Sequence, residues 1–461
     1  MTICAISTAP GVGGIAVIRV SGEQAFAICD KLFKPLAEEI SIATMSANTV
    51  RFGQIVNDTE LVDDVLVSVF HAPHSFTGEH VVEIACHGSQ FIQQEILKLL
   101  LAKGCRLANP GEFTQRAFLN GKMDLSQAEA VADVIASQSR ASHRLAMNQM
   151  RGGFSHELMA LRDQLLTFTS LVELELDFGD HEELEFADRS ELHDLADIIE
   201  GKIGKLAQSF SVGNAIKNGI PVAIVGETNA GKSTLLNVLL NEDRAIVSDI
   251  HGTTRDVIED TVNLHGVLFR FIDTAGLRET SDTIETLGIE RTYQMIEKAN
   301  IVLWVIDSSQ INNQQKWLSD EVQKHAEGKH LILVFNKVDR LDEEGRSSLE
   351  KRFATYPAER IYISAKQHLN TDQLQELLYQ SAQLPDLNDQ DIMVTNIRHY
   401  EALNNAHTAI IRVQDGLNQR ISGDFLSQDI RECLYYLGEI TGQITTDEVL
   451  GNIFSRFCIG K

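Results

Sequence analysis

Cysteine, tryptophan, proline and positive charge are all scarce in this chain of 461 residues. The six cysteines are scattered, without a CxxC pair or the His/Cys spacing of a zinc site, so we expect reduced thiols in a cytosol. No apolar run approaches the roughly 20 residues that span a bilayer. The N-terminus also lacks a basic segment followed by a long apolar one. We therefore expect a cytoplasmic protein with no membrane attachment.

The deficit of positive charge is large, because 40 Lys and Arg residues against 65 Asp and Glu residues give a net charge of −25. Such a balance argues against wholesale binding of nucleic acid or of an anionic membrane. Any contact with RNA must therefore use a local patch. The composition, with 43% hydrophobic and 23% charged residues, is that of a globular protein. The length predicts about three domains.

The first part of the chain predicts an α+β domain that ends near Pro110. Helical spacing of apolar residues occurs at 22–33 and 89–103. Five segments have the alternating or β-branched apolar residues of strands, at 3–7, 15–20, 49–56, 64–70 and 80–86.

Helical patterns lie on both sides of the central part of the chain. Apolar residues recur every three or four positions over 158–172, and again over 403–413 and 426–437. Between the first of these and the centre, residues 173–200 carry twelve acids and one base. We interpret this stretch as a solvated helical face or an acidic loop, because a metal site would need ligands that converge from several elements.

From Pro221 onwards the sequence alternates between strand and helix patterns. This alternation is typical of an α/β unit with a mostly parallel sheet. The predicted strands are 222–225, 267–272, 301–306, 331–335 and 361–363.

The segment from Gly226 to Ser233 matches the phosphate-binding pattern G-x-x-x-x-G-K-[ST]. It follows a predicted strand and opens a predicted helix at 234–240, which is the context that the motif requires. Lys232 should reach the β- and γ-phosphates and serve catalysis, while the Ser233 hydroxyl should bind Mg²⁺. The remaining phosphate contacts are expected from Asn229, Ala230, Gly231 and Thr234.

Three further motifs follow predicted strands and complete a GTP site. Asp273-Thr274-Ala275-Gly276 can hold Mg²⁺ through water and sense the γ-phosphate. In the segment Asn336-Lys337-Val338-Asp339, the last carboxylate can accept hydrogen bonds from guanine N1–H and the 2-amino group. Ser364-Ala365-Lys366 can offer a backbone N–H to guanine O6. These motifs predict GTP as the substrate.

The means of hydrolysis stays open on the residues alone. Leu277 stands where Ras-like proteins have a water-orienting glutamine. Asn229 could coordinate a monovalent cation, or it could simply favour a turn. In the loop 248–256, Thr254 is the natural Mg²⁺ ligand, and Ser248, Ile250 and Thr253 could complete a potassium site. Glu279, Glu285 or Glu290 could orient water, or all three could lie on a solvated face.

The motifs GETNAGKS, SDIHGTTRD and DTAGLRE, the flanking helical regions and the terminus FCIGK together resemble the MnmE family, also called TrmE. The resemblance implies a multidomain chain in which a Ras-like P-loop GTPase domain is inserted into a helical domain behind a folate-binding α+β domain. The implied domains are 1–118, 119–215, 216–380 and 381–461, where the second and fourth fold together. Dimerisation is expected through the N-terminal domains.

The resemblance also assigns roles to particular residues. It implies K⁺ as the activating cation, with Asn229, Ser248, Ile250 and Thr253 as ligands, and Glu285 as the residue that orients water. It places contacts to a tetrahydrofolate derivative on Arg19, Glu83, Lys122 and Lys461. It suggests a catalytic part for Cys458, although the residue type alone favours a small, partly buried residue.

A partner and a substrate follow from the same resemblance. The implied partner is the FAD- and NADH-using protein MnmG, which forms a heterotetramer with the homodimer. Together they would add an aminomethyl or carboxymethylaminomethyl group to the wobble uridine of certain tRNAs, with a one-carbon unit from methylene-tetrahydrofolate. A ribosome-assembly or signalling GTPase is the alternative, but the sequence after 385 lacks the GXXG loop of a KH module.

Overall fold

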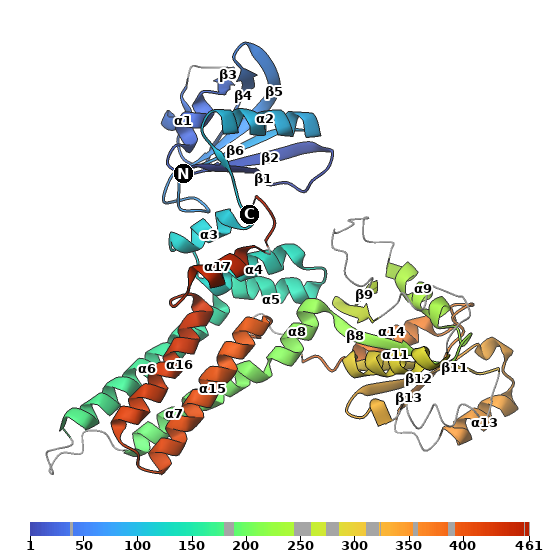
Figure 1. Cartoon of the computed structure of the whole chain (residues 1–461). Coiled ribbons are helices and arrows are strands. Elements are labelled where there is room, and N and C mark those ends of the chain that lie inside the picture. The colour runs from blue at the N-terminus through green and yellow to red at the C-terminus, as the bar shows by residue number, and fades with distance from the viewer. Residues whose placement is uncertain are drawn as a thin grey trace. The chain divides into compact units, whose positions relative to one another are not determined.

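The computed structural model divides into two compact units (Figure 1). The first unit comprises Met1–Ile135, Met147–Gly204 and Glu401–Lys461, and the second comprises Ala136–Ala146 and Lys205–Tyr400. The structure describes residues 1–36, 40–178, 189–243, 260–272, 285–309, 322, 324–353, 358–385, 392–455 and 457–460.

A seven-stranded sheet forms the N-terminal part of the first unit, in the order β3-β4-β5-β6-β2-β1-β7. Neighbouring strands are antiparallel except for β1 and β7. The five strands predicted in this region are confirmed, whereas β3 and β7 are too short to show an alternating pattern. The strands are β1 (Ile3–Ile6), β2 (Gly13–Ser21), β3 (Phe33–Pro35), β4 (Thr49–Asn57), β5 (Glu60–Phe70), β6 (Val81–Gly88) and β7 (Arg106–Leu107).

Alternation along these strands gives the sheet two different faces. One face packs under helices α1 (Ala25–Asp30) and α2 (Gln90–Ala102), and its core includes Ile18 and Val67. The neighbouring position on β2, Arg19, points to the other face, opposite Ala5 of β1 and Glu83 of β6. Ile3, Ala5, Ala108 and Phe113 form a small apolar cluster there, to which α3 (Glu112–Leu119) contributes Phe113.

Antiparallel helices form the rest of the first unit, as the apolar spacing predicted. Helix α16 packs along α6, where Arg162 donates a hydrogen bond to the Leu434 carbonyl oxygen at 3.2 Å. Glu200 of α7 accepts one from His407 of α15 at 2.7 Å. The helices wholly or mostly in this unit are α4 (Leu125–Ala136), α6 (Gly153–Phe178), α7 (Arg189–Gln208), α15 (Ile397–Asn418), α16 (Gly423–Thr441) and α17 (Asp447–Phe454). Helix α5 (Arg140–Met150) belongs to the second unit as far as Ala146 and to the first from Met147.

The second unit contains a six-stranded sheet in the order β13-β12-β11-β8-β10-β9, parallel except between β9 and β10. The predicted parallel α/β unit is confirmed, although the short strand β9 was not expected. A η2 turn (Val338–Arg340) follows β12. The strands are β8 (Ile220–Val225), β9 (Asp260–Leu264), β10 (Val267–Phe271), β11 (Ile301–Asp307), β12 (His330–Asn336) and β13 (Glu359–Tyr362).

Helices cover both faces of this sheet (Figure 1), which explains why β11 is buried along its whole length. Leu303 and its neighbours two positions away pack toward α9 and α14, whereas Trp304 and its neighbours pack toward α11 and α13. The helices are α8 (Phe210–Asn218), α9 (Lys232–Asp243), α11 (Glu285–Lys298), α13 (Glu343–Arg352) and α14 (Thr371–Ser381).

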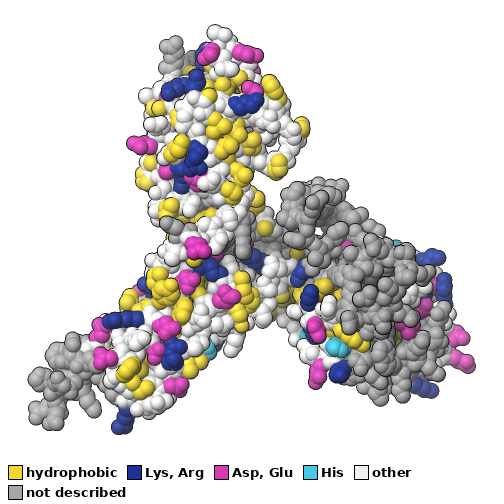
Figure 2. Space-filling model, viewed as in Figure 1, with side chains coloured by type: hydrophobic (Ala, Val, Ile, Leu, Met, Phe, Trp, Pro, Cys, Tyr) yellow, Lys and Arg dark blue, Asp and Glu magenta, His cyan; other side chains and the backbone are white. Residues whose placement is uncertain are grey.

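Surface charge on the first unit is mixed. On the face drawn in Figure 2, Lys and Arg side chains lie among Asp and Glu side chains instead of gathering in one region. Within the described residues, no helix is both long enough and apolar enough to cross a membrane.

Candidate functional site

The phosphate loop lies between β8 and α9, at the carboxyl end of the parallel strands. Its first glycine, Gly226, has φ 148°, and a Cβ atom there would lie 2.2 Å from the Val305 carbonyl oxygen of β11. Asn229 and Gly231 adopt φ values of 65° and 98°. The loop therefore depends on glycine at the two positions where backbone and neighbours approach most closely.

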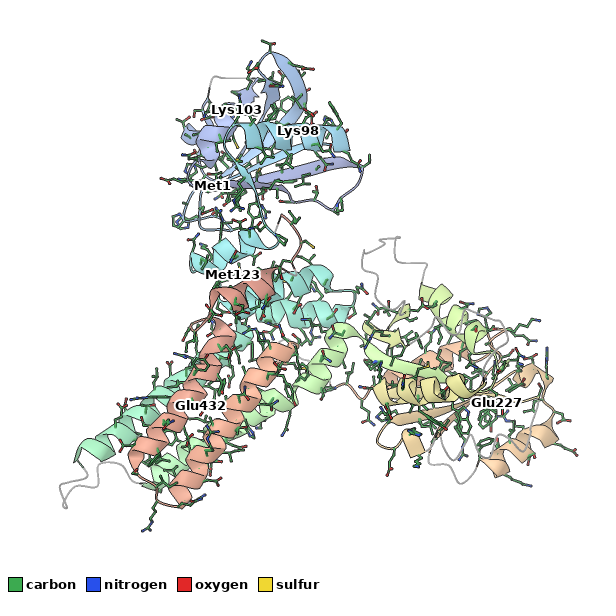
Figure 3. All side chains as sticks on the ribbon, viewed as in Figure 1. Met1, Lys98, Lys103, Met123, Glu227 and Glu432 are labelled. Atoms are coloured by element: carbon green, nitrogen blue, oxygen red, sulfur yellow. The ribbon has the colours of Figure 1, made fainter. Side chains whose placement is uncertain are left out.

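Lys232 is the first residue of α9, and its side chain folds back over the loop. Its Nζ atom donates hydrogen bonds of 2.8 Å to the carbonyl oxygens of both Gly226 and Glu227, the residue labelled in Figure 3. Burial lowers the pKa of this ammonium group, and the nearby Glu227 opposes that change only in part. A phosphate bound in the loop would favour the charged form, because an opposite charge stabilises a desolvated ammonium.

Asn336 connects the phosphate loop with the Ser364–Lys366 segment. This residue ends β12 and is buried, with 2% of its surface exposed. Its side-chain Nδ2 donates to the Ala230 carbonyl oxygen at 2.8 Å, and its Oδ1 accepts from the Ala365 backbone N–H at 3.0 Å. One amide side chain therefore fixes the phosphate loop relative to the Ser364–Lys366 loop, which is expected to contact guanine.

Asp307 is a member of this site that the sequence analysis missed. Lys337, in a left-handed conformation, donates to the Asn229 carbonyl oxygen at 2.7 Å and to Asp307 Oδ2 at 2.6 Å. Ser309 also donates to Asp307 through its hydroxyl and backbone N–H groups. Burial alone would raise the pKa of Asp307, but the hydrogen bonds from Lys337 and Ser309 lower it. In the sequence, the one sign that Asp307 belongs to the site was its position as the last residue of a buried strand.

The expected guanine-recognition residues also lie close together. Asp339 follows β12 and is exposed, while Ser364 is buried just after β13. The Ser364 hydroxyl donates to Asp339 Oδ1 at 2.6 Å, which restricts the orientation of that carboxylate. Lys366 is exposed two residues further along.

Two predicted site residues lie at the start of α9, where Ser233 is half-buried and Thr234 is exposed in the first helical turn.

Other predicted site residues lie wholly or partly outside the described residues. Glu285 begins α11, but its side chain is outside the description. Within the described part of the chain, no three His, Cys, Asp or Glu side chains cluster as metal ligands would. The predicted residues outside the description are Ser248, Ile250, Thr253, Thr254, Asp273, Thr274, Ala275, Gly276 and Lys461.

A second group of predicted residues lies on the face of the N-terminal sheet opposite helices α1 and α2. Arg19 and Glu83 face each other on β2 and β6 and form an ion pair at 2.8 Å, with 19% and 27% of their side chains exposed. The guanidinium carbon of Arg19 lies 5.7 Å from the ring centroid of Phe76 and 5.6 Å from that of Phe113. Both rings lie within the range of a cation–π interaction with this guanidinium and help to hold it in place.

Lys122 approaches the same region through the loop that contains Phe76. Its Nζ atom donates to the Pro73 carbonyl oxygen at 3.0 Å. In the same loop Glu79 accepts two hydrogen bonds from Arg116 of α3. Arg116 also bonds Glu112, so the loop is tied to a charged network.

Glu112 is the buried centre of that charged network. Burial alone would raise the pKa of Glu112, but hydrogen bonds from Arg106, the Asn109 N–H and Arg116 outweigh it and lower the pKa to about 2. The carboxylate is therefore charged at neutral pH and anchors both arginines. Arg116 in turn connects α3 to the loop beside Lys122.

Cys458 differs from the other cysteines. All six lie in the described part of the chain, where none of them forms a disulfide. Five are buried, and Cys458 alone among them is exposed. Its carbonyl oxygen accepts a hydrogen bond from the Gly111 N–H at 3.4 Å, which places the C-terminal tail beside α3.

The sheet order, the phosphate loop at the end of β8, and the Asn336–Asp339 and Ser364–Ala365 segments define the second unit as a P-loop GTPase domain. Two family models match the chain. The MnmE helical domain matches residues 125–458, and the N-terminus of the GTP-binding protein TrmE matches residues 2–122. The chain belongs to the MnmE family.

Individual relatives are similar over the whole chain. The protein "tRNA modification GTPase MnmE" of Parabacteroides distasonis is 62% identical over 461 residues, covering 100% of both chains. That of Bacteroides fragilis is 62% identical over 463 residues, covering 100% of this chain and 99% of the relative. Among solved structures, Era in complex with MgGDPNP and a 16S ribosomal RNA segment is 28% identical, covers 41% of this chain and 66% of Era, and has a TM-score of 0.28.

Proposed function

We propose that this chain is a potassium-activated GTPase that, with an FAD-dependent partner of the MnmG type, modifies the wobble uridine of certain tRNAs. The observation that carries the nucleotide part is the double hydrogen bond of Asn336, which joins the phosphate loop to the base loop. The relatives' names supply the tRNA part.

Guanine recognition is supported by Asp339 and by the Ser364–Lys366 segment. A carboxylate restrained by Ser364 accepts the two N–H donors that guanine carries on one edge. Adenine offers no such pair of donors and would leave the charge unpaired. The Ala365 N–H is already bonded to Asn336 and the Ser364 N–H to the Leu369 carbonyl oxygen, so O6 would be met by the Lys366 backbone N–H. The expected substrate is therefore GTP.

Phosphate binding and Mg²⁺ coordination are proposed for the start of α9. The Lys232 ammonium would exchange its two carbonyl partners for β- and γ-phosphate oxygens, while backbone N–H groups of the loop and the helix N-terminus add positive partial charge. The Ser233 hydroxyl, in the first turn, suits Mg²⁺, with Thr254 and a water on Asp273 as further ligands. Bound Mg²⁺ would neutralise charge that develops on the phosphates.

Potassium activation is proposed because Leu277 cannot orient water or supply charge. Asn229 stands in the phosphate loop in a left-handed conformation, and Lys337 fixes its carbonyl oxygen. The backbone is thus held in place, and the exposed Asn229 side chain is accessible to a cation at the phosphate loop. K⁺ ligands are proposed at Asn229, Ser248, Ile250 and Thr253, and Glu285 is proposed to orient the attacking water.

Replacing K⁺ by Na⁺ is expected to slow single-turnover hydrolysis by on the order of 10²-fold or more, since positive charge at this position is worth 10³–10⁵-fold when an arginine supplies it. Rapid-quench measurements of GTP cleavage in matched salts give the result. Asn229→Ala should remove the K⁺ dependence and keep nucleotide affinity, whereas Glu285→Ala should slow cleavage in both salts. Equal rates of the unaltered protein in K⁺ and Na⁺ would refute the cation proposal.

A folate site is proposed on the N-terminal sheet. Arg19 and Lys122 carry the positive charge that a folate glutamyl carboxylate needs, and Glu83 can accept hydrogen bonds from pterin N–H groups. Phe76 closes one side of Arg19, and the main chain beside Lys461 reaches Arg19 through Gly460. Cys458 is the exposed thiol nearest in sequence to this point. Bound tetrahydrofolate would supply the one-carbon unit.

Domain organisation and assembly belong to the same proposal. We assign residues 1–118 to the folate-binding and dimerisation domain, 119–215 and 381–461 to the helical domain, and 216–380 to the GTPase domain. The protein would act in the cytoplasm as a homodimer, and as a heterotetramer with its partner.

Nucleoside analysis of tRNA from cells that lack this protein tests the tRNA part. Wobble uridine should lose its C5 substituent, and plasmid copies of the unaltered gene should restore it. A copy with Lys232→Ala should not restore it, because phosphate binding fails. A Lys324→Ala copy, altered at a helical lysine away from the nucleotide motifs, should restore it. Normal wobble uridine in the deletion strain would instead favour an assembly or signalling GTPase.

A further inference from the structure

The C-terminal tail connects the end of the chain to its beginning. Beyond α17, the Gly460 carbonyl oxygen accepts hydrogen bonds from the Ser7 hydroxyl at 3.1 Å and from Arg19 NH1 at 3.4 Å. Ser7 and Gly460 are 453 positions apart in the sequence. Figure 1 shows this tail, in dark red, running from α17 toward β1 of the seven-stranded sheet, within the first unit.

Two glycines make the approach of the tail possible. Gly460 has φ 96°, and a Cβ atom there would lie 2.3 Å from the Ile6 carbonyl oxygen. Gly111 has φ 67°, and a Cβ atom there would lie 2.8 Å from the Phe454 carbonyl oxygen. Any larger residue would have to push the tail away at either position, so the tail lies in close contact with the domain.

The two ends of the tail are held by different forces. Phe454, at its start, is buried against Leu125, Ala128 and Leu450, and the Phe457 ring lies 5.3 Å from the Phe454 ring. Gly460, at its other end, is buried, and its carbonyl oxygen accepts hydrogen bonds from Ser7 and Arg19. Apolar packing of Phe454 therefore holds the start of the tail, and hydrogen bonds to Gly460 hold its end.

Arg19 divides its guanidinium between the ion pair and the tail. Its Nε and NH2 atoms lie 2.8 Å from Glu83 Oε1, which leaves NH1 directed at the Gly460 carbonyl oxygen. The NH1 contact is long, whereas Ser7 provides the shorter hydrogen bond to the same oxygen. The Ser7 backbone is itself fixed by a 2.8 Å hydrogen bond from its N–H to the Val17 carbonyl oxygen.

From this geometry we infer that Ser7 is a positioning residue, whose hydroxyl holds the tail at the Arg19–Glu83 pair. It keeps the segment that carries Cys458 beside the pair before any ligand arrives. The effect of Ser7 on folate affinity rests on the proposed function, because a preorganised tail spares the ligand the cost of ordering it. The effect of Ser7 on the position of the tail is independent of the proposed function.

Hydrogen–deuterium exchange of the C-terminal peptide, followed by mass spectrometry on the full-length protein, measures the tail directly. Ser7→Ala and Gly460→Ala should each make residues 455–461 exchange several-fold faster, and Ser7→Thr, which retains a hydroxyl, should restore the slow rate. Ser455→Ala and Gly451→Ala are matched controls, because the Ser455 hydroxyl donates to Asn452 within its own helix end and a Cβ on Gly451 meets no atom within 4 Å. Unchanged exchange in both Ser7→Ala and Gly460→Ala would overturn the inference.

Titration with 5-formyltetrahydrofolate gives the second readout. Ser7→Ala should weaken binding about tenfold, the usual cost of one lost hydrogen bond, and Ser7→Thr should recover it. Faster exchange with unchanged folate affinity would overturn the positioning role. An unaltered protein that binds no folate would refute the folate site, while the exchange experiment would still decide whether Ser7 holds the tail.

Discussion

The Asp339→Asn variant is expected to lose affinity for GTP by on the order of 10³-fold or more and to prefer XTP. The carboxylate accepts from guanine N1–H and the 2-amino group, whereas an amide would place a donor against that amino group and leave a buried polar contact unmade. Xanthine carries a carbonyl oxygen instead of the amino group, so the amide can donate to it. Competition of GTP and XTP against a fluorescent GDP analogue measures both affinities.

Asp342→Asn is the matched control for this exchange. Asp342 lies three residues beyond Asp339 and caps α13, where its Oδ1 accepts from the Gly345 N–H at 2.8 Å. Asn caps helices about as well as Asp, so this variant should bind GTP normally. The guanine assignment fails if Asp339→Asn retains the GTP affinity of the unaltered protein.

The Gly231→Ala variant is expected to bind GTP at least about 10²-fold more weakly. A Cβ atom at this position would lie 2.2 Å from Asn336 Nδ2, the group that bonds the Ala230 carbonyl oxygen. The backbone also has φ 98°, a conformation that costs an alanine about 1–3 kcal/mol. Displacing Asn336 would disturb the phosphate loop and the Ala365 contact together. Isothermal titration with GTP gives the affinity.

Thermal unfolding shows whether the Gly231→Ala protein remains folded, so that weak binding reports on the loop. Gly201→Ala serves as the control, because Gly201 lies within α7 and a Cβ atom there meets nothing within 4 Å. That change should leave GTP affinity unaltered and stabilise its helix slightly. Normal GTP binding by Gly231→Ala would contradict the bridging role given to Asn336.

The pattern of apolar residues was sufficient to predict most of the sheet strands. Alternation in β5 and a continuous apolar run in β11 reflect burial on one face and on two faces respectively. Strands β3 and β7, of three and two residues, carry too few positions to show a period. Their pairing with β4 and β1 is decided by neighbouring strands.

The candidate sites show the same division. The phosphate loop and the guanine motifs could be read directly, since their chemistry requires particular residues at fixed spacing. Asp307 offered only its place at the end of a buried strand, because such a carboxylate acquires its role only when Lys337, just after the neighbouring strand, reaches it. The resemblance pointed to Arg19 and Glu83, but the register of β2 against β6 is what makes them an ion pair.

By itself the sequence determined the order of elements, the class of nucleotide site and the family, because local periodicity and motif spacing are properties of consecutive residues. Only the tertiary structure decided that Asn336 joins two loops, that Lys337 meets Asp307 and Asn229, and that Gly460 lies against Ser7 and Arg19. These contacts connect positions 29 to 453 residues apart. The sheet register and the close approach of backbone at glycine fix them, and neither leaves a periodic trace in the chain.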